Sequence, residues 1–224
     1  MRFGTLDLCV RFATVAVALV GELVAPTRCV ACEERVVPRV LFCAACGSSV
    51  MPASESGGGH FSVFEYGGAV ATAIARFKYA GRSDLAGRFS AIMATACVRS
   101  LVTPAVDLVV PVPLHSRRLV ERGFDQAALL AAPVARRLGL PHAPRALERT
   151  RATPPQASLD RAARSANVAD AFACSSPRIV ARRRVLLVDD VRTTGATLSA
   201  CAEALLAAGA DGVSTLVLAS RNRV

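Results

Sequence analysis

Two adjacent acids and a hydroxyl-rich turn lie within the stretch VLLVDDVRTTGAT, residues 185–197. Asp189 and Asp190 follow a short apolar run, 185–188, that is typical of a strand buried on both faces of a parallel sheet. Ligands of such sheets bind at the carboxyl ends of the strands, which is where we expect these acids to lie. The residues of the turn that follows are Thr193, Thr194, Gly195, Ala196 and Thr197.

This turn is expected to begin a helix, because Leu198, Cys201 and Leu205 recur at helical spacing. The N–H groups at a helix N-terminus and its dipole bind phosphate well, and hydroxyl groups add further donors. Asp189 and Asp190 would accept hydrogen bonds from the vicinal hydroxyls of a ribose, or hold a hydrated Mg²⁺. The pattern therefore predicts a site for a ribose 5-phosphate. The alternative is an acidic turn whose only role is to cap the helix.

Basic residues that could bind a pyrophosphate occur at two other places. The loop LHSRRLVERGFDQA follows a second apolar strand, 107–113, and puts Arg117 and Arg118 near the carboxyl end of that strand. Guanidinium groups match phosphate oxygens in geometry and charge. Lys78 is the only lysine of the chain, and its compact ammonium group would also suit a phosphate. The alternatives are an exposed basic helix turn for the arginines and chance for the lysine.

Four cysteines, Cys29, Cys32, Cys43 and Cys46, have the spacing C-x2-C-x10-C-x2-C. Each CxxC pair can form a tight turn that directs two thiolates at one point, and four thiolates suit a tetrahedral Zn²⁺. Such closed sites are structural rather than catalytic. Disulfides and an iron–sulfur cluster are the alternatives, but the paired spacing in a cytosolic chain favours zinc.

The whole composition is compatible with one main domain and a small appendage. The chain has 224 residues and a formal net charge of +10, which favours anionic ligands, nucleic acid included, without choosing among them. The absence of Trp argues against a stacking platform for single-stranded nucleic acid. The apolar run 12–20 is too short to span a bilayer and is expected within a helix over 3–25. We therefore expect a cytoplasmic protein without a membrane span, and a signal peptide is the alternative.

Apolar strands alternate with helical patterns along the rest of the chain, which predicts an α/β domain with a mainly parallel sheet flanked by helices. A Pro-, Ser- and Gly-rich linker at 51–60 separates an N-terminal helix and metal-binding part, 1–52, from the main domain, 60–224. Pro133 is expected to kink or divide its helix. Strands are expected at 61–66, 107–113, 142–149, 185–188 and 213–219. A polar stretch after 149 is expected to close over a charged substrate through Gln156, Arg164 and Asn167.

The motif VLLVDDVRTTGAT resembles the loop with which type I phosphoribosyltransferases bind phosphoribosyl pyrophosphate (PRPP). With FKYAG, VVPVPL, ERGFDQA and the paired CxxC turns, nearly the whole chain resembles the ComF family, in which a zinc ribbon precedes a type I phosphoribosyltransferase-like domain. The resemblance implies PRPP and Mg²⁺ as ligands, a cytoplasmic location and, in competent bacteria, a part in DNA uptake during natural transformation. One departure is Asp125, where the family usually has Asn.

Three classes of function fit these features. The first is an enzyme that transfers a phosphoribosyl group from PRPP to an acceptor that the sequence does not identify. The second is a non-catalytic competence factor that senses PRPP or handles single-stranded DNA. The third is an interaction protein whose zinc ribbon binds a partner, such as a DNA-uptake protein. The sequence indicates no oligomeric state.

Overall fold

A computed structural model describes residues 26–53, 58–100, 106–150 and 171–221. The chain divides into two compact units, Met1–Ser48 and Ser49–Val224. The helix expected over 3–25 lies outside the described residues. The domain boundaries expected from the sequence, 1–52 and 60–224, stay a prediction.

The described part of the first unit consists of tight turns and one short helix, α2 (Ala44–Gly47). The first turn is closed by the backbone N–H of Cys29, which donates to the Glu34 carbonyl over 2.7 Å. The second turn leads into α2, where the N–H of Gly47 donates to the Cys43 carbonyl over 2.7 Å. Each CxxC pair therefore lies in a tight, hydrogen-bonded turn, as a metal-binding knuckle requires.

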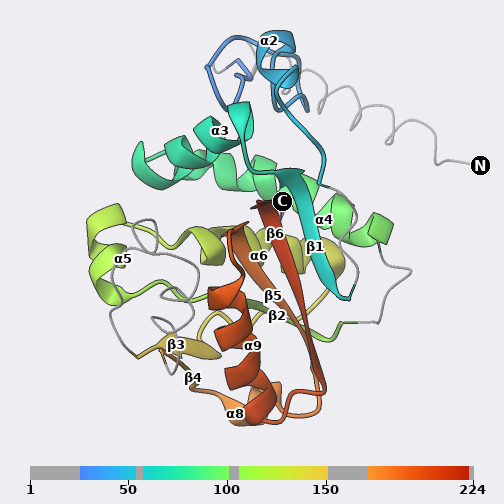
Figure 1. Cartoon of the computed structure of the whole chain (residues 1–224), viewed down its shortest axis with the longest axis vertical. Helices are drawn as coiled ribbons and strands as arrows, with labels where there is room; N and C mark the ends of the chain where they lie inside the picture. The colour runs from blue at the N-terminus through green and yellow to red at the C-terminus, as the bar shows by residue number, and fades with distance from the viewer. Residues whose placement is uncertain (1–25, 54–57, 101–105, 151–170, 222–224) are drawn as a thin grey trace, which may run out of the picture. The chain divides into compact units, whose positions relative to one another are not determined.

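The second unit is built on a four-stranded sheet in the order β1-β6-β5-β2 (Figure 1). Its strands are β1 (His60–Glu65), β2 (Leu108–Pro111), β5 (Arg184–Arg192) and β6 (Gly212–Ser220). All neighbouring strands in this sheet are parallel. Their carboxyl ends therefore meet at one edge, and the predicted α/β class with a parallel sheet is confirmed.

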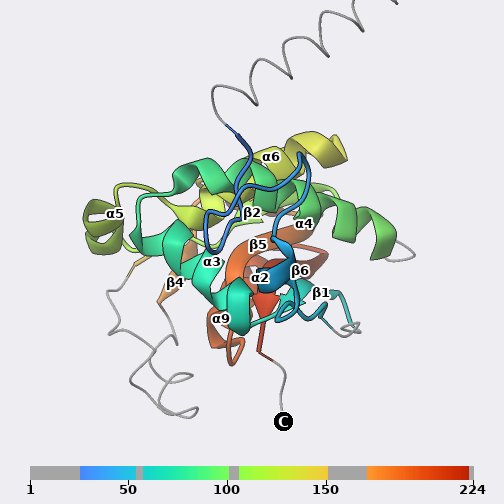
Figure 2. The ribbon, with the colours of Figure 1, turned by 90° about the horizontal axis from the view of Figure 1, so that it is seen from above.

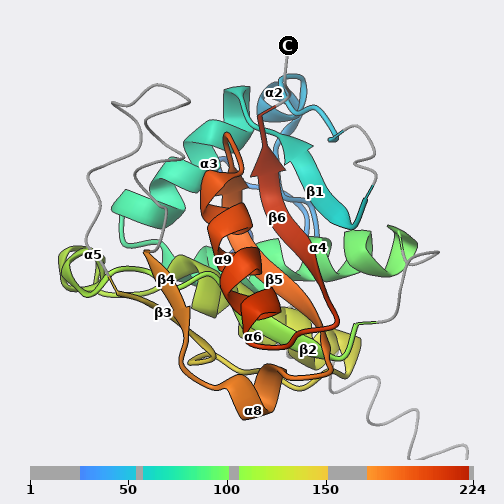
Figure 3. The ribbon, with the colours of Figure 1, turned by 60° about the horizontal axis from the view of Figure 1, so that its bottom comes forward.

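Helices cover both faces of this sheet, as Figures 2 and 3 show. The helices α4 (Ala86–Ser100) and α6 (Gln126–Leu138) lie on one face, and α9 (Ala196–Ala207) lies on the other. On the α9 side, Val185, Leu187 and Val217 belong to one buried cluster with Cys201 and Leu205 of the helix. This apolar contact fixes the start of α9 beside the carboxyl end of β5. In the described part of the chain, no helix has the length and apolar character needed to cross a membrane.

Smaller elements lie around the main sheet. These are α3 (Gly68–Tyr79), η1 (Ser83–Leu85), α5 (Ser116–Arg122), α8 (Pro177–Val180) and the antiparallel hairpin of β3 (Leu147–Arg149) and β4 (Phe172–Cys174). In Figure 1, α3 lies beyond the carboxyl ends of β1 and β6. Of these elements, α3, α5 and β3 supply residues that line the cavity described below.

Four expectations from the sequence need correction. The strand expected at 142–149 is limited to the short β3, which pairs with β4, and His142 forms only a single bridge with Val109 of β2. Pro133 does not divide α6, which runs unbroken from Gln126 to Leu138, and the kink stays a prediction. Part of the expected linker pairs with β1, since Pro52 forms a bridge with Phe64. The strand expected at 185–188 continues to Arg192, because its later residues still pair with β6.

Candidate functional site

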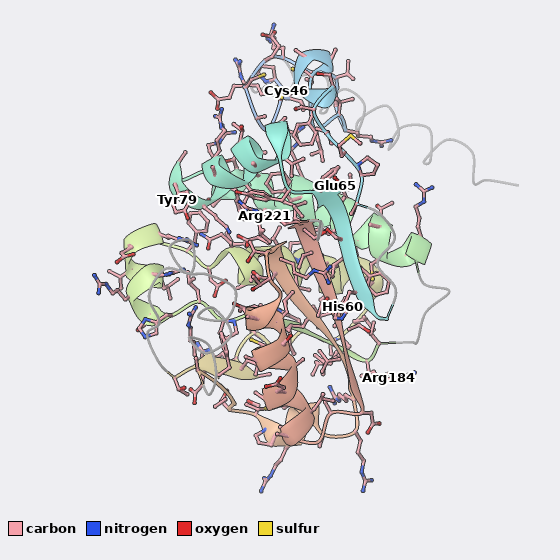
Figure 4. All side chains as sticks on the ribbon, in the orientation of Figure 1. Cys46, His60, Glu65, Tyr79, Arg184 and Arg221 are labelled. Carbon is pink, nitrogen blue, oxygen red and sulfur yellow. The ribbon has the colours of Figure 1, made fainter. Side chains whose placement is uncertain are left out.

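A cavity of about 620 Å³ opens at the carboxyl ends of the strands. Asp189 and Asp190 of β5 line it, together with Thr193 from the connection to α9 and Thr197 from the first turn of that helix. In Figure 4, Tyr79 and Arg221, which also line the cavity, lie toward this end of the sheet. The cavity is therefore at the edge where parallel α/β sheets bind ligands.

The turn between β5 and α9 has the backbone that its sequence requires. Gly195 has a φ of +86°, in the left-handed region that glycine adopts without steric cost, and it immediately precedes the first residue of α9, Ala196. The Thr194 hydroxyl accepts a hydrogen bond from the Ala196 N–H over 3.4 Å. The structure thus places the five predicted turn residues, 193–197, at the N-terminus of a twelve-residue helix. Such a terminus attracts anions through its N–H groups and dipole.

Lys78 of α3 forms an ion pair with Asp190, with 2.9 Å between Nζ and Oδ2. Burial by itself would lower the pKa of Lys78, but the adjacent Asp190 carboxylate more than offsets this and raises the pKa, so the ammonium group stays charged. The sequence predicted that Lys78 binds pyrophosphate together with Arg117 and Arg118. The structure places Lys78 against Asp190, and the side chain also lines the cavity.

The two acids differ in their surroundings. Burial, together with the neighbouring charge of Asp190, raises the pKa of Asp189 to about 8. The Asp190 N–H donates to Oδ1 of Asp189 over 2.8 Å, which leaves the second oxygen for other partners. The surroundings of Asp189 therefore favour its protonated form, whereas Asp190 is held against an ammonium group.

Only one of the two predicted arginines lines the cavity. Arg118 does, but the Arg117 side chain is 81 % exposed and its Nε lies 3.2 Å from Oε1 of Glu121. Both residues lie on the short helix α5, so the turn of the helix directs their side chains differently. The structure thus places Arg118 at the cavity and Arg117 outside it.

Arg149, which the sequence analysis missed, lines the cavity from the end of β3. Its guanidinium carbon lies 5.3 Å from the centre of the Phe172 ring. Burial lowers the pKa of Arg149, and the positive charge of Arg118 lowers it further. Two guanidinium groups that repel each other beside a cavity form a natural anion site. The sequence held a signal for this residue, since Arg149 ends a predicted strand just before a polar stretch.

Asp125 has a structural role. Its Oδ1 accepts from the Ala128 N–H over 3.0 Å, which caps α6, and its Oδ2 accepts from the Leu114 N–H over 3.1 Å. Burial raises the pKa of this carboxyl. An Asn has one side-chain oxygen and could replace only one of these two acceptors. The carboxylate thus ties the start of α6 to the loop after β2.

The predicted contacts of the polar stretch, Gln156, Arg164 and Asn167, lie outside the described residues.

The four cysteines of the first unit lie close together. Their Sγ atoms are all within 4.8 Å of one another, and those of Cys32 and Cys43 are 3.6 Å apart. A tetrahedral zinc ion with Zn–S bonds of about 2.3 Å would hold its sulfurs about 3.8 Å apart. Although burial opposes ionisation, the backbone N–H groups of Cys32 and Cys43 lower the pKa of Cys29 to about 6. The four thiols therefore fit a zinc ion in number, chemistry and spacing.

Comparison with known proteins finds a domain family, sequence relatives and a solved structure. The family described as "Phosphoribosyl transferase domain" matches residues 125–223. The "DNA utilization protein YhgH" of Salmonella typhi is 32% identical over 203 residues, covering 85% of this chain and 88% of its own. The "Competence protein ComFC" of Bacillus subtilis is 30% identical over 159 residues, covering 70% and 62%. The solved structure of a glutamine PRPP amidotransferase from B. subtilis is 23% identical, with a TM-score of 0.36, over 60% of this chain and 25% of that chain.

Proposed function

Because this chain belongs to the ComF family, we propose that it binds PRPP and transfers the phosphoribosyl group to an acceptor. The family and the fold predicted from the sequence are confirmed: a phosphoribosyltransferase domain with a parallel sheet, and an N-terminal cysteine cluster that fits a zinc ribbon. The observation that carries the proposal is the acid pair at the end of β5, followed directly by the hydroxyl-lined start of α9.

The ribose 5-phosphate part of PRPP fits this arrangement group by group. The phosphate binds at the start of α9, where Thr193 and Thr197 add hydroxyl donors to the N–H groups of the helix. The ribose hydroxyls bind the two acids. A protonated Asp189 can both donate to and accept from a hydroxyl, while the Asp190 carboxylate accepts only.

The pyrophosphate part binds Arg118 and Arg149, whose guanidinium groups offer several donors in a planar arrangement. During transfer, the bond from C1 to the pyrophosphate oxygen breaks and its electron pair leaves with pyrophosphate. The acceptor then supplies the electron pair for the new bond to C1. The arginines stabilise the charge that develops on the leaving group, and the acids stabilise the positive character at C1.

Mg²⁺, which the resemblance implies, fits the two acids poorly. One oxygen of Asp190 already contacts Lys78, so the pair does not offer two free carboxylates. Mg²⁺ prefers oxygen ligands that include phosphates. We therefore expect it to come with the pyrophosphate.

Calorimetric titration with PRPP tests this proposal. Asp189→Asn and Thr197→Val should each weaken PRPP binding, by about tenfold for the acid, because hydrogen bonds to the ligand are lost. Asp190 is a poorer choice, since its loss would leave Lys78 buried without its partner. Asp211→Asn, at the exposed amino end of β6, is the matched control. Equal PRPP affinity in all four proteins would overturn the assignment.

Turnover is measured separately, as pyrophosphate released from PRPP in the presence of candidate acceptors. Release that depends on an acceptor supports the enzyme. PRPP binding without release, whatever the acceptor, would instead favour a PRPP-sensing protein.

A role with DNA is a second candidate, because the relatives carry the names "DNA utilization protein" and "Competence protein". The exposed Arg117 on α5 is a residue that could contact nucleic-acid phosphates without entering the cavity. Partners would then be single-stranded DNA or proteins of DNA uptake.

For the first unit we propose one structural zinc ion held by Cys29, Cys32, Cys43 and Cys46. When bound, zinc would link the two turns and stabilise their fold. Four thiols persist in a reducing compartment, so we also propose a cytoplasmic location. We keep 1–52 and 60–224 as the proposed domains.

A further inference from the structure

The order of the strands divides the cavity into two sides. The acids of β5 lie between the segment that follows β2, which bears Arg118, and the segments that follow β6 and β1. If the pyrophosphate occupies the β2 side, the nucleophile must reach C1 of the ribose from the opposite side. That side is lined by Tyr66, directly after β1, and Arg221, directly after β6.

Tyr66 and Arg221 are held together there. The guanidinium carbon of Arg221 lies 5.1 Å from the centre of the Tyr66 ring. Their backbones are anchored as well, since the Tyr66 N–H donates to the Ser220 carbonyl over 2.8 Å and the Arg221 N–H donates to the Arg192 carbonyl over 3.0 Å. Both side chains therefore start from fixed positions at the ends of paired strands.

The charge of Arg221 is available for a ligand. Among the described residues, no carboxylate forms an ion pair with Arg221. Arg184, at the opposite end of β5 in Figure 4, is instead paired with Asp107. A planar guanidinium group presents two parallel donors that match the two oxygens of a carboxylate.

The neighbouring wall formed by α3 has an aliphatic part. Ile74 and Ala75 of α3 line the same cavity as Tyr66, together with Lys78 and Tyr79 of the same helix, and α3 contains no acid. Flat ring systems stack on aromatic side chains and on guanidinium planes, and they fit against aliphatic side chains. The β1 and β6 side of the cavity thus combines the ring of Tyr66, on which a flat ligand can stack, with the guanidinium group of Arg221.

We propose that this side is the acceptor subsite, and that it takes a nitrogen-containing aromatic ring bearing a carboxylate. The proposal rests on the phosphoribosyl transfer inferred above. Arg221 binds the carboxylate, Tyr66 stacks on the ring, and a ring nitrogen supplies the electron pair for the new bond to C1. The electron pair of the broken C1–O bond leaves on pyrophosphate, and a proton on the attacking nitrogen, where there is one, passes to water.

Two pairs of compounds that differ only in the carboxylate test this subsite: orotate against uracil, and nicotinate against nicotinamide. Their binding to the full-length protein is measured by calorimetry, with and without saturating PRPP. We expect at least one carboxylate to bind about tenfold more tightly than its uncharged partner, as a paired charge predicts. The Arg221→Gln variant should lose this preference, and the matched control Arg184→Gln should keep it.

Thermal unfolding checks that both variants are folded, and Arg221→Lys, which keeps the charge but not the planar fork, should restore part of the preference. Absence of a preference in the wild type, or its persistence in Arg221→Gln, would overturn the proposal. An Arg221-dependent preference in a protein that does not bind PRPP would support the subsite and overturn the phosphoribosyl transfer. The two conclusions are therefore distinguishable.

Discussion

Lys78 and Asp190 form a buried ion pair across the cavity, with 2.9 Å between nitrogen and oxygen and side-chain exposures of 19% and 8%. Lys78 belongs to α3 and Asp190 to β5, so the pair fixes the helix to the acid-bearing end of the central strand. Lys78 is also the only lysine of the chain. The acid that we assign to ribose is therefore positioned by a residue far away in the sequence.

Replacing Lys78 should destabilise the protein strongly. Lys78→Met leaves the Asp190 carboxylate buried without its partner, and the free energy of unfolding should fall by about 3–5 kcal/mol. The matched control is Arg184→Met, which breaks the exposed pair with Asp107 and should lower the free energy of unfolding far less, because water screens that pair. Urea denaturation measures both. Similar small losses in the two variants would mean that the Lys78 pair is not buried in solution.

The raised pKa of Asp189 predicts a pH-dependent stability. The folded protein keeps the Asp189 proton up to about pH 8, whereas the unfolded chain releases it near pH 4. Between these values the unfolded state binds fewer protons, so stability falls as pH rises, by at most about 1.4 kcal/mol per pH unit. In Asp189→Asn this contribution should be absent. Urea denaturation at intervals from pH 5 to about 8 measures the free energy of unfolding of both proteins against pH. The same pH dependence in the wild type and in Asp189→Asn would show that Asp189 is ionised in the folded state.

Local sequence patterns predicted the elements well, because each signal lies within one segment. The apolar run 185–188 and the spacing of Leu198, Cys201 and Leu205 led directly to β5 and α9. The CxxC spacing similarly predicted that the four thiols meet. In these cases the period of the apolar residues, or the reach of a short turn, determines the geometry.

Side-chain direction and long-range partners could not be predicted in this way. Arg117 and Arg118 are adjacent in sequence, yet only Arg118 lines the cavity, because rotation along α5 separates them. The partner of Lys78 depends on where α3 packs, which no local pattern encodes. Arg149 was overlooked since its strand joins a separate hairpin, and its place beside Arg118 arises only from the tertiary fold.

Removing one thiol should release the metal from the first unit. We expect one zinc per chain by elemental analysis, and its loss in Cys43→Ser, because three thiolates and a hydroxyl bind zinc more weakly than four thiolates. Cys174→Ser, a cysteine outside the cluster, should keep the metal. PRPP binding should survive in both variants, since every cavity residue belongs to the second unit. Metal-free protein with disulfides among the four cysteines would contradict both the zinc site and the reducing compartment.

The last prediction separates the arginines that serve PRPP from those that could serve DNA. Arg118→Gln and Arg149→Gln should weaken PRPP binding by about tenfold or more and leave the binding of ribose 5-phosphate, which lacks pyrophosphate, nearly unchanged. Arg117→Gln is the matched control on the same helix as Arg118, and it should change neither affinity, because its side chain is exposed and faces Glu121.

The same variants are then titrated with single-stranded DNA at several salt concentrations. If Arg117 contacts DNA, the affinity of Arg117→Gln for DNA should depend less on salt than that of the wild type. The variant makes one phosphate contact fewer and therefore releases fewer counterions on binding. Arg118→Gln and Arg149→Gln should keep the wild-type salt dependence if their side chains serve the cavity. Equal losses for PRPP and ribose 5-phosphate, together with a reduced salt dependence in these two variants, would reassign the cavity arginines from pyrophosphate to DNA.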